Sequence, residues 1–248
     1  MQTPKLCWDI GTAYDMFISL NVLHAPDKFG LRGAWAAGVR SRLPNTERDA
    51  LQAILPAIST PLHWLYDLPS PKNGLAILQT LAAITPEGRL AAIAKAPYLP
   101  PEIFVILEDV AARRAWQNTD LTRLQELYHT VWDQKLTGKE LKEKAIWALE
   151  AWSRPLETGE GLLSGLQAYY DVFFAEEELR IGPALEAALA RAQELAQQMP
   201  LAALIETLSQ GVRLTRSLER QELVLAPSFW GDPLMIYGQI GPERDMVV

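Results

Sequence analysis

The sequence predicts a mostly helical protein with a small antiparallel β-sheet near its C-terminus. Apolar residues recur at the helical period over much of the region from about 12 to 211. Capping residues placed directly before proline, as in Thr85–Pro86, indicate helix starts within that region. From about 212 to 248 the pattern changes to short runs of β-prone residues separated by turns. We therefore expect one domain over 1–248, with a helical body followed by a sheet.

The first part of the chain begins with a weak alternation at Leu6, Trp8 and Ile10. This pattern predicts a short strand over about 5–10, which could join the C-terminal sheet. Three helices should follow, over 14–23, over 31–42, and from 44–46 to the vicinity of Pro56, because proline ends or kinks a helix. Ser70–Pro71 and Thr85–Pro86 predict the next two helix starts.

The middle of the chain carries the clearest local signals. A helix is expected from 100 to about 116, and another begins at Asp120. Thr137 and Glu140 have the spacing of a capping box, and an apolar stripe follows them. The region 154–165 combines proline with three glycines and is therefore predicted to be a break between helices.

Three further helices are expected after this break. They cover 166–180, a segment that opens at Gly182–Pro183, and a short segment from Pro200 to Gly211. Three strands are then predicted over 212–214, 222–226 and 234–237.

Composition restricts the class of protein. The chain has 23 Lys and Arg against 30 Asp and Glu, a formal charge of −7, which disfavours a dedicated nucleic-acid binder. The single Cys7 excludes an internal disulfide and any zinc site made of several cysteines. The first residues do not resemble a signal peptide, and no run of 18 apolar residues occurs, so we expect a soluble cytoplasmic protein without a membrane partner.

Motifs for catalysis, metal binding or cofactor binding are not found in the sequence. His24, His63 and His129 are isolated, without the spacing of a metal site. Gly161 to Gly165 has the wrong spacing for a nucleophile elbow, and Gly159 and Gly161 follow a helix where a dinucleotide fingerprint needs a strand. We predict no catalytic residue, no metal and no cofactor.

Helix 200–210, followed by a predicted hairpin, superficially resembles a winged helix. The helix has no Lys or Arg and one Glu206, so it offers nothing to phosphates or to base edges. We therefore expect no DNA-binding residues in this segment.

Tryptophan is unusually frequent, with 8 residues against 7 Tyr and 6 Phe. Several tryptophans fall on consecutive helices in the middle of the chain, and Trp64 and Tyr66 precede them. The candidate ligand-binding residues are therefore Trp64, Tyr66, His129 and Trp132, which could line an apolar pocket. The alternative, which we favour, is that such residues fill a core built from short helices.

Two stretches carry a resemblance to a known family. Residues 13–30, with 35–44 after them, resemble the start of the N-terminal helical domain of ArsR-like bacterial winged-helix transcriptional regulators. Residues 223–229, which include Pro227 and Ser228, resemble the strand and Pro-Ser pair with which that domain closes.

The resemblance implies a regulatory domain for ligand sensing or dimerisation, and so a homodimer with a possible small apolar ligand. In this family a winged-helix domain follows and contacts DNA. Its opening pattern does not occur in these 248 residues, so by resemblance DNA would be reached only through a domain that this sequence lacks. Two other functions stay open, an enzyme that uses an apolar site around Trp64, His129 and Trp132, and a protein-interaction module.

Overall fold

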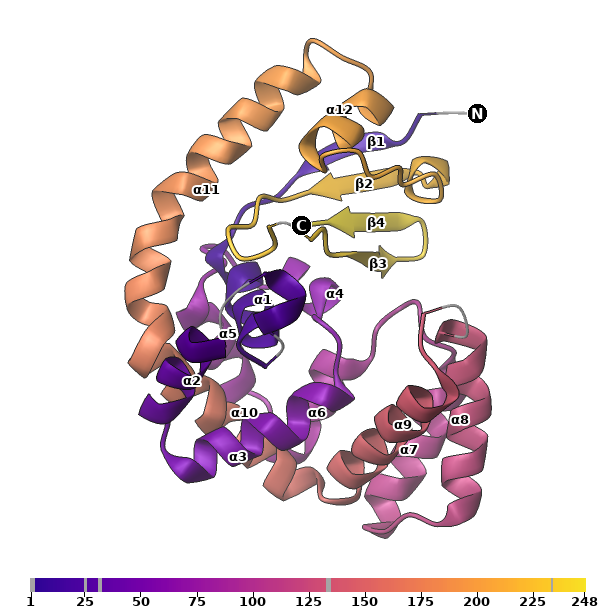
Figure 1. The fold of residues 1–248 in the computed structure, drawn as a ribbon. Coiled ribbons are helices and arrows are strands. Elements are labelled where there is room, and N and C mark those ends of the chain that lie inside the picture. Colours follow the sequence, from indigo (N-terminus) through magenta and orange to yellow (C-terminus); the bar gives the residue numbers. More distant parts are fainter. Residues whose placement is uncertain (1–2, 25, 31–32, 133–134, 233) are drawn as a thin grey trace. The chain divides into compact units, whose positions relative to one another are not determined.

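The computed structural model describes residues 3–24, 26–30, 33–132, 135–232 and 234–248. It confirms a mostly helical fold with a small sheet near the C-terminus (Figure 1). The chain divides into two compact units, each built from separated segments. The sheet unit comprises 1–39, 62–77 and 173–248, and the helical unit comprises 40–61 and 78–172. None of the helices in the described ranges is long and apolar enough to cross a membrane.

The sheet unit contains all four strands. Its elements, some of which continue into the helical unit, are β1 (Lys5–Trp8), α1 (Thr12–His24), η1 (Pro26–Phe29), α2 (Gly33–Arg42), α4 (Leu62–Tyr66), α5 (Gly74–Ala82), the π-helical turn η3 (Tyr170–Phe174), α11 (Ala175–Ala196), α12 (Leu201–Leu208), η4 (Ser217–Glu219), β2 (Glu222–Leu225), β3 (Tyr237–Gly241) and β4 (Arg244–Val247).

The sheet has the strand order β1-β2-β4-β3 and is mixed. The predicted antiparallel pairing holds for β3 and β4, whereas β1 pairs with β2, and β2 with β4, in parallel. The predicted N-terminal strand is confirmed and occupies one edge of the sheet. β1 and β2 can pair in parallel because α1 to α12 lie between them in the chain and supply a long crossover. β2 and β4 are parallel because the chain between them turns twice, through the β2–β3 loop and through β3, which is antiparallel to β4.

The strand boundaries differ in part from the prediction. Segment 222–226 is confirmed as β2, but 212–214 forms no strand, because the Ser209 side chain bonds both the N–H and the carbonyl of Val212. Of 234–237 only Tyr237 belongs to a strand. The prediction missed β4, whose apolar pattern is interrupted by Asp245. That carboxylate is buried, and its Oδ2 accepts a hydrogen bond from Ser217 at 2.8 Å while its Oδ1 lies 3.2 Å from Nε of Arg220.

Helix α12 packs on one face of the sheet, beside β1 and β2 (Figure 1). Leu204 and Ile205 of this helix are buried together with Leu223, Leu225 and Val247 from alternate strand positions. The opposite face is apolar too, since Val224 and Met246 are fully buried. Both faces of the parallel strands are thus covered, as is usual for parallel sheets.

Helix α11 is continuous through Gly182 and Pro183, where the sequence analysis placed a new helix start. That prediction was wrong. Pro183 cannot donate a hydrogen bond to the carbonyl of Leu179 four residues earlier, but Leu179 is 81% exposed, so water can satisfy this carbonyl. The free-energy cost of Pro183 inside the helix is therefore smaller than the stabilisation that packing of the rest of α11 provides.

The helical unit is built from α3 (Asn45–Ile54), η2 (Leu55–Ala57), α6 (Pro86–Ala94), α7 (Pro101–Arg113), α8 (Asn118–Trp132), α9 (Gly138–Ser153) and α10 (Pro155–Tyr169). The helix starts predicted at Thr85–Pro86 and at the Thr137–Glu140 capping box are confirmed. The start predicted at Ser70–Pro71 is wrong, because α5 begins at Gly74, where the Asn73 side chain accepts the N–H of Ala76 at 2.9 Å.

The region 154–165, predicted as a break, is instead the first part of α10. Its glycines allow close helix packing. A Cβ on Gly159 would lie 1.7 Å from the carbonyl oxygen of Pro86 in α6, and a Cβ on Gly165 would lie 2.7 Å from Leu51 in α3. These glycines allow α10 to pack closely against α3 and α6. The prediction of a break was wrong because it rested on glycine content alone.

Candidate ligand cavity

A cavity of about 250 Å³ lies within the sheet unit. Its floor is formed by the buried apolar residues Ile205, Leu225, Ala226 and Val247. The walls are Ala188, Leu189 and Ala192 of α11, Leu208 of α12, and Trp8 of β1. The loop between β2 and β3 closes one side, with Pro227, Ser228, Gly231, Asp232, Leu234 and Met235. The volume exceeds the roughly 150 Å³ of an apolar cavity that holds benzene.

The cavity lies where the three parallel strands end. Trp8, Leu225 and Val247 are the last residues of β1, β2 and β4, and the sheet register places them side by side. All three line the cavity. In open sheets with parallel strands, ligands bind beyond the carboxyl ends of the strands, where diverging connections leave a crevice. Here β2 leads into the loop and β1 leads towards α1, so the crevice follows from the topology.

Polar side chains are few among the described residues that line the cavity. Of the described lining residues, Ser209, Gln210, Ser228 and Asp232 carry polar side chains, and Gln210 and Asp232 are exposed. None of the described lining residues is Lys, Arg, His or Cys. A mostly apolar lining with a few polar groups is typical of a small-molecule binding site.

Asp15 of α1 fixes the loop that closes the cavity. Its Oδ1 accepts hydrogen bonds from the Ser228 hydroxyl at 2.7 Å, from the Phe229 N–H at 2.9 Å and from the Trp230 N–H at 2.8 Å. The Ser228 oxygen in turn accepts the Gly231 N–H at 2.8 Å. Asp15 is fully buried, so each of these bonds acts in a medium of low dielectric constant. The conformation of residues 228–231 therefore depends strongly on this carboxylate.

The second carboxylate oxygen of Asp15 is buried without a hydrogen-bond partner in the described part of the chain. Burial raises the pKa of Asp15 to about 6, although the bonds from Ser228, Trp230 and Phe229 lower it and the charge of Glu177 raises it further. Burial prevails because one oxygen gains no compensating contact.

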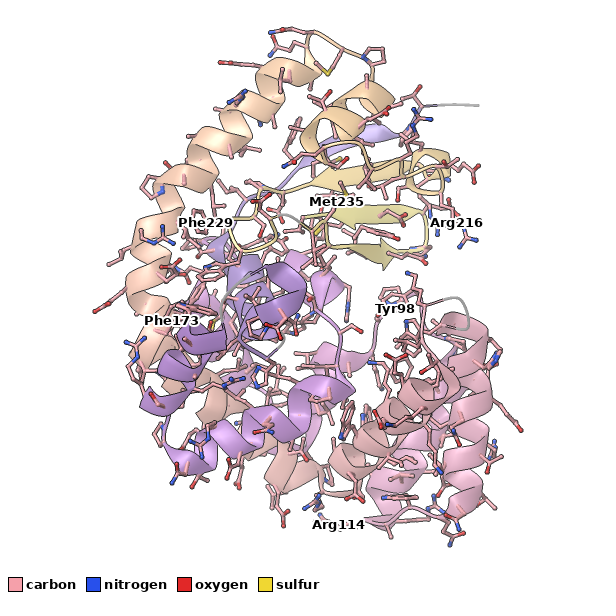
Figure 2. The ribbon with its side chains drawn as sticks, viewed as in Figure 1. Tyr98, Arg114, Phe173, Arg216, Phe229 and Met235 are labelled. Atoms are coloured by element: carbon pink, nitrogen blue, oxygen red, sulfur yellow. The ribbon has the colours of Figure 1, made fainter. Side chains whose placement is uncertain are left out.

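Glu177 of α11 holds the same loop from another side. It accepts a hydrogen bond from the indole N–H of Trp230 at 3.0 Å and pairs with Arg180. The Trp230 ring stacks on Trp35 with 5.1 Å between the ring centres, and the guanidinium of Arg180 lies 4.5 Å from the centre of the Phe229 ring. Figure 2 labels Phe229 and Met235, which come from this loop. The β2–β3 loop, which forms one side of the cavity, is thus in direct contact with both α1 and α11.

Two of the predicted ligand-binding residues, Trp64 and Tyr66, lie on α4 of the sheet unit. Trp64 packs edge-on against Phe17, with 6.4 Å between the ring centres. The Tyr66 ring lies under Lys72, whose Nζ is 4.5 Å from the ring centre. Both rings thus have packing partners within the unit, and neither residue is among the described residues that line the cavity.

The other two, His129 and Trp132, lie on α8 of the helical unit. The side chain of His129 is exposed, and Trp132 packs edge-on against Tyr128 at 4.9 Å. Nζ of Lys144 lies 5.1 Å from the centre of the Trp132 ring and donates to the carbonyl of Pro56 at 3.4 Å. Burial lowers the pKa of Lys144 to about 8.

The structure identifies site residues that the sequence analysis did not select. Trp8 was assigned only to a weak strand, and Asp15 stands in the predicted helix 14–23 directly before Met16, Phe17 and Ile18. These apolar neighbours were a usable signal for Asp15, because a carboxylate that is buried among apolar residues needs a partner. In the described ranges, no three His, Cys, Asp or Glu side chains gather as they would around a metal ion.

Comparison with protein-family models, with curated proteins and with solved structures finds no match to this chain.

Proposed function

We propose that this chain is a ligand-sensing regulatory domain of the kind found in ArsR-like transcriptional regulators, and that it binds a small, largely apolar molecule in the cavity at the strand ends. The observation that carries the proposal is the cavity itself, with a buried apolar floor at the carboxyl ends of β1, β2 and β4.

The contacts of Asp15 support this proposal further. Asp15 belongs to the first stretch that resembles the regulators, and Ser228 and Phe229 belong to the second. The three residues are joined directly by hydrogen bonds. Hydrogen bonds thus join two stretches that lie more than 200 positions apart in the sequence, and the second of these stretches belongs to the loop that closes the cavity.

The same contacts provide a route for sensing. A molecule in the cavity touches the β2–β3 loop, and this loop is fixed by Asp15 on α1 and by Glu177 on α11. Occupancy that favours one loop position over another would therefore bias the positions of two helices. Binding is favoured over catalysis because the described lining residues offer hydroxyl groups and one carboxylate but no histidine, cysteine or lysine.

Homodimer formation stays part of the proposal through the resemblance. A cytoplasmic location stays part of it through the sequence pattern of the chain, and the lack of DNA contact by these residues through their acidic balance and the resemblance. Sedimentation of the purified chain measures the first of these. A dimer in the micromolar range is the expected result, and a monomer at all concentrations would remove dimerisation from the proposal.

A substitution that fills the cavity with a larger side chain tests the proposal. Ala192 is buried on α11 and lines the cavity, so Ala192→Phe should occupy much of the space. Calorimetric titration with 2-phenylethanol, a small apolar probe, should show binding to the wild type and at least tenfold weaker binding to this variant. Ala190→Phe, on the exposed side of the same helix, is the matched control and should bind as the wild type does.

If the wild type does not bind the probe, or if Ala192→Phe binds it unchanged, the cavity is not the ligand site. Circular dichroism of both variants shows whether α11 remains folded, so that loss of binding can be assigned to the filled cavity.

A further inference from the structure

The charge distribution at the mouth of the cavity indicates which ligands it prefers. Asp232 is the one residue with a charged side chain among the described residues that line it, and it is exposed at the rim. A ligand with a negative group would meet this carboxylate and, in the lining described, no cation to offset it.

The end of α12 adds negative potential at the same cavity. Leu208, Ser209 and Gln210 line the cavity, and they form the last residue of this helix and the two that follow it. A helix C-terminus carries a partial negative charge, and α12 has no basic residue in its last turn. Arg213, which follows shortly afterwards, is bonded to Glu206 at 3.1 Å. Two independent sources of negative potential thus belong to one cavity.

The floor places the opposite requirement on the ligand. Ile205, Leu225 and Val247 are buried and apolar, so a charge at this depth would lose its hydration without gaining a partner. A ligand that suits both regions has an apolar body on the floor and a positive group at the mouth, where that group keeps contact with water. The indole of Trp8, which also lines the cavity, is a ring type that favours nearby cations.

We infer that the cavity selects hydrophobic amines, that is, small molecules with an apolar body and one ammonium group, which Asp232 and the C-terminal end of α12 hold at the rim. This inference rests on the proposed function, because it specifies the ligand class of the same cavity. It assigns to Asp232 the role of the residue that determines charge selectivity.

Three probes of nearly equal size test the inference on the full chain. They are 2-phenylethylamine, which is positive at pH 7, 2-phenylethanol, which is neutral, and phenylacetate, which is negative. Calorimetric titration should give the order amine, alcohol, carboxylate, with the amine bound about threefold to tenfold more tightly than the alcohol, as expected for a partly exposed charge next to a helix end. Raising the salt concentration from 0.05 M to 0.5 M should reduce this preference to below twofold.

The variant Asp232→Asn keeps the size of the side chain and removes its charge. It should lower the affinity for the amine by at least threefold and leave that for the alcohol unchanged. Glu186→Gln removes an exposed carboxylate of α11 that does not line the cavity, and it should change neither affinity.

The possible failures can be told apart. Equal binding of the three probes, or tighter binding of phenylacetate, overturns the inference while the proposed function stands. An amine preference that is as large in Asp232→Asn as in the wild type overturns the role of Asp232. If none of the three probes binds, both the inference and the proposed function fail.

Discussion

At the scale of single residues, the two oxygens of the Asp15 carboxylate have different environments. One of its oxygens accepts three hydrogen bonds from consecutive residues, and the other is buried without a partner. The first oxygen orders the loop, whereas the second makes the ionised form costly. Folding and loop order therefore depend on the protonation state of this side chain.

Asp15 should make the stability of the protein depend on pH in an identifiable way. Its pKa is about 6 in the folded protein, against about 4 for an unperturbed aspartate, so between these values the folded state binds more protons than the unfolded state. The contribution of this group is fully present below pH 4 and is lost as pH rises through 6. The free energy of unfolding should fall by roughly 3 kcal/mol from this group.

Urea unfolding between pH 4 and pH 7.5 measures this dependence. Asp15→Asn keeps an oxygen for the three hydrogen bonds and has no titrating group, so its profile should be flatter than that of the wild type by this amount. Asp109→Asn, an exposed site on α7, should keep the wild-type profile. Parallel profiles for the wild type and Asp15→Asn would contradict the assignment.

The sequence could predict only part of this site. Ser228 was noticed within the Pro-Ser pair, and Asp15 lay within the first resembling stretch, but no local signal joined them. Their contact crosses 213 positions and arises from tertiary packing. Periodicity describes which face of an element is apolar, and it carries no information on which distant loop meets that face.

At the scale of elements, the helical unit depends on the close approach of α10 to α3 and α6. Gly159 and Gly165 stand at the contacts with Pro86 and Leu51. Local signals correctly predicted the starts of α6 and α9: Pro86 is the first residue of α6, and Thr137 and Glu140 form a capping box at the start of α9. Gly159, by contrast, is explained only by a helix about 70 positions away, and for this reason it was misread as a break.

Adding a methyl group at Gly159 should disrupt this contact. The new Cβ would lie 1.7 Å from the backbone oxygen of Pro86, which cannot rotate away, so Gly159→Ala should lower the free energy of unfolding by about 3 kcal/mol or more. At Gly38 of α2 a Cβ meets nothing within 4 Å, so Gly38→Ala should stabilise the protein by roughly 0.5–1 kcal/mol.

Thermal unfolding of the two variants beside the wild type compares these effects directly. A midpoint for Gly159→Ala equal to that of the wild type would show that α6 and α10 do not approach as closely as described. A lower midpoint for Gly38→Ala would instead point to an unrecognised contact of α2.

At the scale of the whole molecule, the chain consists of two units that interleave along the sequence. We predicted one domain over 1–248. The two units cannot be seen in the composition along the chain, since each unit is assembled from separated segments. Both units are mostly helical, but the strands all belong to the sheet unit, as does the cavity. We therefore expect ligand binding to affect one unit directly.

Methionine methyl groups provide the most direct test of where a ligand binds. The chain has 5 Met, of which Met235 lines the cavity, whereas Met16 and Met246 are fully buried and are not among its described lining residues. NMR spectra of protein labelled with ¹³C at the methionine methyl groups should be recorded during titration with 2-phenylethanol, with the Met235 signal assigned from Met235→Leu. The account predicts a saturable shift that is largest for Met235. The absence of any shift, or a largest shift at Met16, would contradict ligand binding in this cavity.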